Sequence, residues 1–452
     1  MTKVPSIAAE VPLVDAVALL RDAGIRIAHV GLFDLMGTFR ERRLGLDDVI
    51  PTMDGGGTFV NVLPQWDAAE QVFGAGPFVG EAVRVDPASI RPYPFEADAC
   101  FMVADYVGPS ASLSPRRLLQ TQIDKAAAMG FAVQAAFESE FFVLEEDETS
   151  LRDGGFATMK PFARDNRCWA GESAATHADF VTGLEDVLQH GGLDLLALSL
   201  ELGPGCFEAT HRHKDPLRAA EDHLFFKLLT KAYCRQQGKT ASFMAQLGAG
   251  LPGLSQHPHL SLCDKKSGEN LFAAGDGAGM SLLFRQFVAG VVALIPEAMA
   301  LTHHTTNAYR RIAPGNWAPK SASWAVQNYA AAVRVVTAPA SHCRLEYRLP
   351  GADAHPYLNL AYLLGAGLWG IENAAALPEA FVGGGPDDMP EGTESLPHDL
   401  FTAAERLAAS DRARTIWGVE FIENFIVAIR REEAALRRET SAAERARYLE
   451  VV

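Results

Sequence analysis

Charged and apolar side chains alternate along one segment near the C-terminal end of the chain. Arg344, Glu346 and Arg348 occupy every second position, with Leu345 and Tyr347 between them. Because the side chains of a strand alternate between its two faces, this pattern predicts a β-strand with all three charges on one face. An apolar stretch follows, so both faces are expected to be buried. Charges buried together are paired, or they hold a metal ion or a polyanion.

Two other predicted strands carry titratable side chains in the same way. Glu138 and Glu140 share one face inside the run Phe131–Leu144, which is otherwise almost wholly apolar. His257 and His259 share one face of the segment His-Pro-His-Leu-Ser-Leu. Each pair alone is more typical of a surface strand or a structural ion pair than of a ligand set. Their joint occurrence favours a common site.

A predicted turn adds two further carboxylates. Glu201 and Glu208 flank the segment Leu-Gly-Pro-Gly-Cys-Phe, whose glycines and proline turn the chain and can bring the two side chains together. With Glu138, Glu140 and Glu346 they form a set of five carboxylates, which together with a histidine exceeds what one divalent ion needs. Oxygen ligands with a single imidazole suit Mg²⁺ or Mn²⁺ better than zinc, which prefers cysteine and histidine.

The periodicity elsewhere predicts helices and one domain boundary. A helix is expected at Val14–Ala23 and a strand at Ala99–Tyr106, in a region of short strands and turns. A Gly-Pro-Ser break follows, and Ser114-Pro115 is typical of a helix start. We therefore expect an N-terminal domain at 14–108 and a larger domain at 114–452. Further helices are expected at about 114–129, 215–236, 280–300, 322–334 and 355–374, then a surface loop at 382–397 and a helical tail at 403–449.

Composition indicates which kinds of partner and which cellular compartment to expect. The chain has 452 residues and a formal net charge of −16, which argues against nucleic acid or a membrane surface as the main partner. The six cysteines show no CxxC spacing, and the N-terminus lacks the apolar core of a signal peptide, so the cytoplasm is expected. The longest apolar run, about 287–302, is broken by Pro296 and Glu297 and predicts a buried helix. An anionic substrate would need a local cluster of arginines, which could come from Arg311, Arg334, Arg344 and Arg348.

Common nucleotide and nucleophile motifs do not account for this chain. The segment 248–253 matches GxGxxG, but no helix is predicted after it and a proline lies inside it, so a dinucleotide fingerprint is disfavoured. The sequence contains no Walker A loop and no nucleophile elbow. Any nucleotide chemistry therefore requires a different kind of site.

Several ordered blocks resemble the glutamine synthetase family, and the resemblance runs through essentially the whole chain. It implies an α+β fold: an N-terminal β-grasp domain and a large catalytic domain with a curved antiparallel sheet flanked by helices. It also implies an ATP-dependent acid–amine ligase whose sites are shared between subunits of stacked rings, usually dodecamers. The blocks are Phe137–Phe142, Glu201–Glu208, His257–Leu262 with Asn270–Phe272, Asn307–Pro319, Arg344–Pro350 and His355–Leu358.

The resemblance also implies roles for individual residues. Two divalent ions, Mg²⁺ or Mn²⁺, would be held in each site. The first would take Glu140, Glu201 and Glu208, and the second Glu138, His257 and Glu346. The residues near ATP would be His259, Ser261, Arg334 and Arg344; those that contact the acid substrate would be Arg311, Arg348, Glu140 and Gly253. Asp34 would be lent across the subunit interface to the amine, so the implied catalytic residues are Asp34, Arg311 and Arg334.

The chain departs from the family pattern at the loop expected to cover the site, 313–320. Ammonia-using members carry a glutamate there that helps to take a proton from ammonium, and this chain has Trp317. An aromatic wall suits an alkyl or aryl group better than an ammonium ion. The alternative is a tryptophan that only packs the loop. Other departures lie at 252–256, at Gln327-Asn328-Tyr329 in place of an arginine, and at Ser341 in place of a lysine.

We therefore expect a ligase that joins glutamate and a primary amine through γ-glutamyl phosphate, close in character to the γ-glutamyl-amide synthetases. The acid could also be a derivative of glutamate. One alternative is a glutamine synthetase that uses ammonia, which Trp317 disfavours. A second is a non-catalytic structural relative, which the complete set of candidate metal ligands disfavours because a buried carboxylate cluster is costly to keep without a function.

Overall fold

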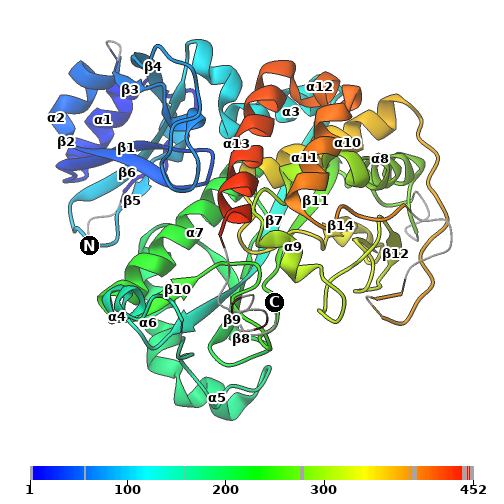
Figure 1. The fold of residues 1–452 in the computed structure, drawn as a ribbon. Coiled ribbons are helices and arrows are strands. Elements are labelled where there is room, and N and C mark those ends of the chain that lie inside the picture. Colours follow the sequence, from blue (N-terminus) through cyan, green and yellow to red (C-terminus); the bar gives the residue numbers. More distant parts are fainter. Residues whose placement is uncertain are drawn as a thin grey trace.

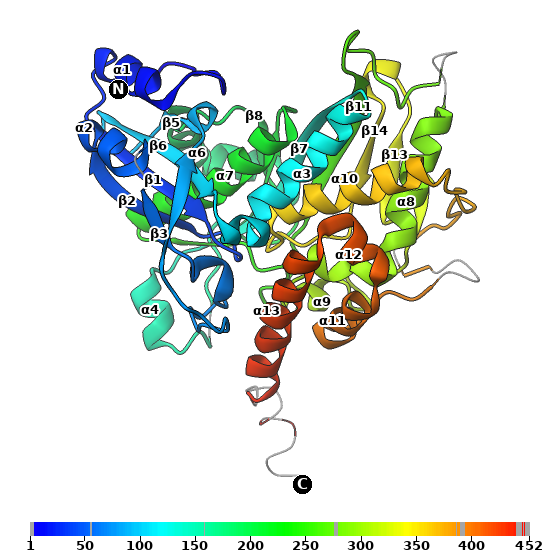
Figure 2. The same ribbon diagram turned by 90° about the horizontal axis from the view of Figure 1, so that it is seen from above.

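The structure is a computed structural model that describes residues 4–54, 57–157, 159–274, 279–385, 387–388, 394–439, 445 and 447. Two β-sheets and the helices around them make up the described chain (Figure 1). The smaller sheet and its helices come from the N-terminal part, drawn in blue, and lie to one side of the larger sheet. Figure 2 shows the same arrangement from above, with the C-terminal helix α13 extending away from the body of the molecule.

The smaller sheet is mixed and has the strand order β2-β1-β6-β4-β3, with β5 paired to β6. Strand β1 lies parallel to β6 and antiparallel to β2. All but the first residue of β1 are buried, and Val30 and Met102 pack in one core with Val17 and Leu20 of helix α1. The strands are β1 (Ile27–Phe33), β2 (Phe39–Gly45), β3 (Thr58–Val60), β4 (Gly80–Val85), β5 (Arg91–Pro92) and β6 (Ala99–Tyr106), the last with the predicted bounds.

The larger sheet has the order β12-β13-β14-β11-β7-β9-β8, and β10 pairs with β7. Along the long central strand β7, buried residues alternate with half-buried ones: Phe137 and Phe141 are fully buried, whereas Glu138 and Glu140 lie on the opposite face. The strands are β7 (Phe131–Leu144), β8 (Leu195–Leu200), β9 (Cys206–His211), β10 (Thr240–Ser242), β11 (Gln256–Asp264), β12 (Trp324–Val326), β13 (Val333–Val336) and β14 (Arg344–Tyr347).

One expectation about this sheet was wrong. The segment 322–334, expected to be a helix, instead forms strand β12, a connecting loop and the first residues of strand β13. These two strands are parallel to each other, whereas the other described strand pairs of the sheet are antiparallel as expected. Alanines in the segment favour a helix, but Trp324, Val333 and Val335 are buried in the sheet, and such tertiary packing overrides local propensity.

The expected helices at Val14–Ala23 and at 114–129, 215–236, 280–300 and 355–374 are present, with ends shifted by a few residues. The tail expected to be helical at 403–449 forms three helices as far as residue 437, and its residues 440–444, 446, 448 and 449 lie outside the described residues. The helices are α1 (Leu13–Asp22), α2 (Leu46–Val49), α3 (Pro115–Ala128), α4 (Glu148–Asp153), α5 (Gly171–Thr176), α6 (Ala178–His190), α7 (Pro216–Gln236), α8 (Leu282–Ala298), α9 (Ala308–Arg311), α10 (Pro356–Glu372), α11 (Leu400–Ala409), α12 (Asp411–Trp417) and α13 (Val419–Arg437).

Helices α8 and α10 pack against each other, and α10 also contacts β11 of the larger sheet. A side chain on Gly370 would meet the backbone of α8, its Cβ only 2.2 Å from the Gln286 carbonyl oxygen, so the two helices approach at glycines. Pro296 lies near the end of α8 and does not break it. Among the described residues, Leu282–Leu301 alone is long and apolar enough to cross a membrane, but 67% of its most apolar window is buried inside the protein.

The two parts of the chain have separate apolar cores, one built from residues 7–106 and the other mainly from residues 118–429. Between them Ser114 caps α3, its side chain accepting a hydrogen bond from the Arg117 amide. The predicted limits of the domains, 14–108 and 114–452, stay predictions. All six cysteines are free thiols.

Two histidines lie in the apolar layer between the larger sheet and α7. The Nε2 atom of His211, on β9, is 3.3 Å from the Nδ1 atom of His223, on α7, and the His223 ring stacks on Phe137. Burial lowers the pKa of His211 to about 4 and holds the pKa of His223 well below its usual range. Both rings are therefore neutral at pH 7.

This pair should make stability depend on pH. In the unfolded chain both imidazoles bind protons below about pH 6.5, whereas the folded chain resists protonation until about pH 4. The free energy of unfolding should therefore fall as the pH drops through this window. His223→Phe, which keeps a ring in the same aromatic cluster, should reduce the loss of Tm between pH 7 and pH 5. His398→Phe, at an exposed histidine, is the control. An equal loss of Tm between pH 7 and pH 5 in the wild type and both variants would contradict this account.

Candidate active site

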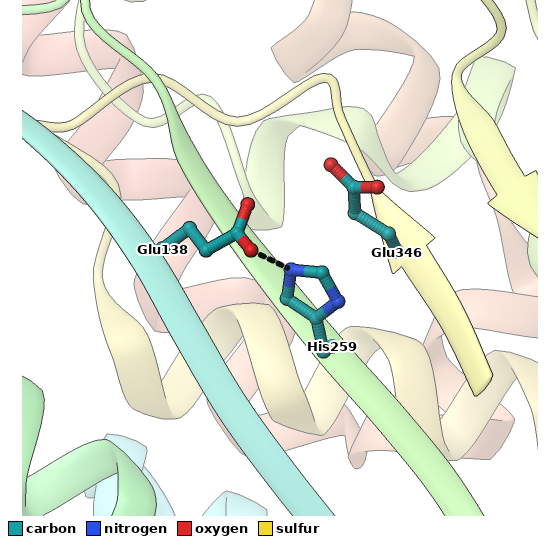
Figure 3. Close-up of side chains that lie close together, drawn as sticks. All are labelled: Glu138, His259 and Glu346. Carbon is teal, nitrogen blue, oxygen red and sulfur yellow. Dashed lines mark ion pairs between the residues drawn. The ribbon is translucent and has the colours of Figure 1, made fainter. Parts of the chain in front are cut away.

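Strand register brings three of the predicted residues together on one face of the larger sheet. Strand β11 pairs with β7 and β14, so that His259 lies opposite Glu346, and His257, two residues before it, lies opposite Glu138. The Nε2 atom of His259 is 3.4 Å from Glu138 Oε1, and one ligand atom from each of the three residues lies within 4.8 Å of the others. Figure 3 shows the three side chains turned toward one another from three different strands. They form a group that could hold a metal ion.

His257, the histidine assigned to that metal by resemblance, lies on the other side of Glu346. Its Nδ1 atom is 3.4 Å from Glu346 Oε1 and 3.5 Å from Arg348 Nη1. Burial and the nearby Arg348 guanidinium hold the pKa of His257 well below its usual range, so the ring is neutral and able to act as a ligand. Its Nε2 atom is buried without a hydrogen-bond partner. The geometry thus groups Glu138 and Glu346 with His259, and the role of His257 stays a prediction.

A second group of carboxylates lies across β7 and β9. Glu140 is paired in register with Glu208, and Glu201 follows β8 at the start of the turn between β8 and β9. The expected reversal of the chain is present, with positive φ angles of +104° at Gly203 and +74° at Gly205 that favour glycine. One Glu140 oxygen accepts a hydrogen bond from a backbone amide, whereas Glu201 Oε2 is buried without a partner.

This second group concentrates negative charge. Burial raises the pKa of Glu208 to about 8, and Glu140 and the other carboxylates add to the rise. Burial also raises the pKa of Glu140, although Arg311 partly opposes it. Carboxylates that share a site in this way are stabilised by a divalent cation bound through their oxygens. The donor set and the unpartnered Glu201 oxygen therefore fit the Mg²⁺ or Mn²⁺ that the sequence predicts.

Arginines surround the first group. Arg334 Nη1 lies 2.6 Å from Glu346 Oε2, and Arg348 forms an ion pair with the other oxygen of the same carboxylate. Arg344 donates a hydrogen bond of 3.2 Å to Nδ1 of His259. Burial alone would raise the pKa of Glu138, but His259, Arg348 and Arg344 outweigh it and lower this pKa to about 2. The two carboxylate groups therefore lie in opposite electrostatic surroundings.

An open cleft of about 1200 Å³ lies beside these groups. Arg311 is buried at its inner end, and its Nη1 atom donates a hydrogen bond of 2.7 Å to the Leu349 carbonyl. A Cβ on Gly253 would lie 2.7 Å from Arg311 Cγ, so glycine leaves room for that side chain. Trp317, in the loop 313–320, is 65% exposed on the cleft wall. The predicted site residues that line the cleft are Glu140, Glu201, Gly253, His257, Arg311, Trp317 and Arg348.

Two predicted residues belong neither to the cleft lining nor to the two carboxylate groups and their arginines. Asp34 is buried at the end of β1, where its carboxylate receives hydrogen bonds from Arg40 Nε at 2.8 Å and Trp66 Nε1 at 3.2 Å, and from two backbone amides. Its carbonyl contacts His355 at the start of α10, so Asp34 lies where the two sheets' domains meet. Ser261 is half-buried in β11, opposite Gln134. Their assigned roles stay predictions.

Sequence reasoning missed two residues that touch the site. The Sγ atom of Cys168 is 3.1 Å from Glu201 Oε1, and burial together with that carboxylate raises the thiol pKa to about 11, so the thiol is protonated. No spacing signal points to Cys168. The Tyr329 ring lies against two arginines, with the Arg334 guanidinium 4.1 Å and the Arg348 guanidinium 5.0 Å from its centroid. The departure at Gln327-Asn328-Tyr329 was the available signal for this residue.

Comparisons with known proteins identify the family of this chain. The family model described as the glutamine synthetase catalytic domain matches residues 112–448. A glutamate–isopropylamine ligase from Pseudomonas sp is 31% identical over 88% of this chain and 89% of its own length. The γ-glutamylethanolamide synthetase GlnA4 of Streptomyces coelicolor is 31% identical over 84% of this chain and 79% of its own length. A type-1 glutamine synthetase of Dictyostelium discoideum is 30% identical, covering 93% and 82%.

Solved structures confirm the fold class. A structure of GmaS in complex with ADP superposes with a TM-score of 0.83, covering 96% of this chain and 99% of that one, at 24% sequence identity. Binding of ATP and divalent metals is typical of the family whose model matches, and the carboxylate and histidine groups described above are of that type. The chain therefore belongs to the glutamine synthetase family of carbon–nitrogen ligases.

Proposed function

We propose that the protein joins the γ-carboxylate of glutamate to a primary amine larger than ammonia, using ATP. The observation that carries the proposal is the position of Trp317, whose exposed indole forms part of the wall of the cleft that Arg311 and Arg348 also line. Relatives named as a glutamate–isopropylamine ligase and a γ-glutamylethanolamide synthetase also support an amine larger than ammonia.

The acid substrate fits the inner end of the cleft. Arg311 and Arg348 supply two guanidinium groups there, and Arg311 keeps its positive charge because its pKa, although lowered by burial, stays at about 10. Guanidinium groups bind carboxylates through paired, charge-assisted hydrogen bonds. A dicarboxylic amino acid such as glutamate, or a close derivative, matches this pair of cations.

The carboxylates fit two divalent ions. Glu140, Glu201 and Glu208 would hold one, and Glu138 and Glu346 with His257 or His259 would hold the other. When bound, such ions neutralise the negative charges that gather when a phosphoryl group moves to a carboxylate. Arg334 and Arg344, which already contact Glu346 and His259, would place positive charge next to the ATP phosphates.

The proposed reaction has two steps. A glutamate γ-carboxylate oxygen attacks the γ-phosphorus of ATP and ADP leaves; the amine nitrogen then attacks the acyl carbon and phosphate leaves with the electrons of the broken C–O bond. The amine loses a proton to a base, for which Asp34 of a neighbouring subunit is the candidate. An alkylamine, with a pKa near 10.4 as in lysine, needs that base at pH 7, whereas an arylamine arrives neutral.

The assembly and the location form part of the proposal. Asp34 lies in this chain's N-terminal part and does not line the cleft, so its participation requires a second subunit. Stacked rings of identical subunits, with sites between neighbours, would meet that requirement. A cytoplasmic enzyme fits the six free thiols.

The first experiment is to measure phosphate release by the purified protein with ATP, Mg²⁺ and glutamate, across ammonia and a panel of amines, with mass identification of the products. Turnover with an amine class and little with ammonia supports the proposal. Turnover with ammonia alone would identify a glutamine synthetase with an unusual loop. Absence of turnover with every amine would overturn the proposed function.

Replacing the aromatic wall by a carboxylate should shift the enzyme toward ammonia. In Trp317→Glu the ratio of kcat/KM for ammonia to that for an alkylamine should rise about tenfold or more, since one charge-assisted hydrogen bond is worth roughly 1.5–3 kcal/mol. Phe156→Glu, at a similarly exposed aromatic residue outside the cleft lining, is the control and should leave the ratio unchanged. An unchanged ratio in Trp317→Glu would mean that Trp317 does not select the amine.

Metal binding should depend on pH through Glu208. In the metal-free protein this carboxyl keeps its proton up to about pH 8, so a cation must displace the proton. The apparent affinity for Mn²⁺ should therefore rise as the pH increases from 6 to 8 and then level off. Glu208→Gln should bind Mn²⁺ more weakly and with a flatter pH dependence, whereas Glu185→Gln on the exposed face of α6 should behave as the wild type. Titration calorimetry measures both, and a wild-type affinity independent of pH would contradict the assignment.

A further inference from the structure

Large apolar side chains are exposed on several walls of the cleft. Leu202 is 53% exposed, Met244 44% and Trp317 65%, and Leu251 also lines the cleft. They come from three connections of the backbone: the turn after β8, the loop between β10 and β11, which carries both Met244 and Leu251, and the loop 313–320. Exposed apolar side chains that gather around one concavity mark a ligand site more often than a bare surface.

The walls of the cleft carry few carboxylates that could pair with a second positive charge on the amine substrate. Among the described residues that line the cleft, the carboxylates are Glu140 and Glu201, both in the group that fits a metal ion. The cations are Arg310, Arg311 and Arg348. A substrate with a distal ammonium group would therefore meet Arg310 without finding a carboxylate free to pair with it.

We infer that the amine carries an uncharged, apolar tail, alkyl or aryl, and that Leu202, Met244, Leu251 and Trp317 form the subsite for that tail. The inference rests on the proposed function and names the class of amine. Each methylene of the tail that the apolar walls cover makes binding more favourable. Binding of a diamine or polyamine is less favourable because it buries an ammonium group without a partner. In the proposed reaction the amine nitrogen would face the acyl phosphate, and the tail would lie against these apolar walls.

The test compares tails of matched length. With the wild type, kcat/KM should rise about threefold to fourfold per methylene from ethylamine to hexylamine, in line with the transfer of apolar surface. Benzylamine should be used at least as well as butylamine. 1,4-Diaminobutane and spermidine should be used at least tenfold less well than butylamine and hexylamine. Diamines used better than the alkylamines would overturn the inference while leaving the proposed function intact.

Placing a carboxylate in the cleft should improve the use of a diamine relative to an alkylamine. Met244→Glu should raise the ratio of kcat/KM for 1,4-diaminobutane to that for butylamine about tenfold, because the distal ammonium gains a partner. Leu251→Glu repeats the test from a second position in the same loop. Val382→Glu, at a 96% exposed residue outside the cleft lining, is the control for added charge. An unchanged ratio in both cleft variants would overturn the inference.

Two other outcomes are distinguishable. If the apolar residues are instead covered by a second copy of the chain, Met244→Glu should change the oligomeric state measured by light scattering and leave amine preference unchanged, which would overturn the inference. Absence of phosphate release with ammonia and with every amine would overturn the proposed function itself.

A different observation supports a second inference, about Tyr329. Its ring packs against the guanidinium groups of Arg334 and Arg348 at 4.1 Å and 5.0 Å, and its carbonyl accepts a 2.9 Å hydrogen bond from Arg348 Nε. Gln327, with a φ of +55°, accepts a 2.8 Å hydrogen bond from Arg334 Nη2. Both arginines also contact Glu346. One short loop therefore orients the two cations that flank this carboxylate.

We propose that Tyr329 is a positioning residue that acts through these arginines, again on the basis of the proposed function. The flat ring restrains each guanidinium through its π-face and leaves the N–H groups free to bind anions. The phenol hydroxyl takes no part in these contacts. The ring, rather than the hydroxyl, should therefore be the required feature.

Tyr329→Phe should keep near wild-type kcat, whereas Tyr329→Ala should lower kcat about tenfold and weaken ADP binding in titration calorimetry, with the KM for the amine unchanged. Phe401→Ala, which removes a comparable contact with Arg437 at 4.8 Å, is the control. A Phe variant as impaired as the Ala variant, or an Ala variant that binds ADP as the wild type does, would overturn the proposal.

Discussion

The carboxylate of Glu346 is fully buried at the centre of β14, and a charge there without partners would be strongly destabilising. Ion pairs from Arg334 and Arg348 meet it from both sides. These partners come from β13 and from the residue that follows β14, so the compensation depends on strand register. A shift of one residue in either strand would turn the charges to the opposite face. Register in this part of the sheet is therefore set by charge pairing as well as by apolar packing.

The same face of the sheet contains two electrostatic regions. Around Glu138, histidine and arginines hold the carboxyl ionised far below neutral pH. Around Glu208, burial and the other carboxylates keep the Glu208 carboxyl protonated up to about pH 8. The first region has an excess of positive charge and suits anionic groups, and the second has an excess of negative charge and suits cations. A reaction that brings phosphate, carboxylate and divalent ions together uses both kinds of surroundings.

Much of this arrangement could be predicted from the sequence, because alternation on a strand specifies the face of each side chain without any knowledge of the partner strand. That is why Glu138 with Glu140, and the charges from Arg344 to Arg348, were placed correctly. Which histidine faces which carboxylate depends on pairing between distant strands, and the structure groups His259 with Glu138 and Glu346. The prediction of a helix at 322–334 was wrong for a related reason, because strands β12 and β13 within this segment pair with each other in the sheet. That pairing cannot be read from the alanines of the segment.

The exposed apolar residues of the cleft and the residues that carry the buried charges belong to different parts of the backbone. Leu202, Met244 and Trp317 lie in turns and loops, outside the paired strands, whereas Glu138 and Glu346 lie within the ladder. A substitution in a turn leaves the ladder and its charge pairs untouched. Evolution, or an engineer, can therefore exchange the cleft wall by single substitutions at small cost in stability, while changes in the strands would disturb charge pairing throughout the site. The backbone thus separates the part of the protein that is free to diversify from the part that must stay constant.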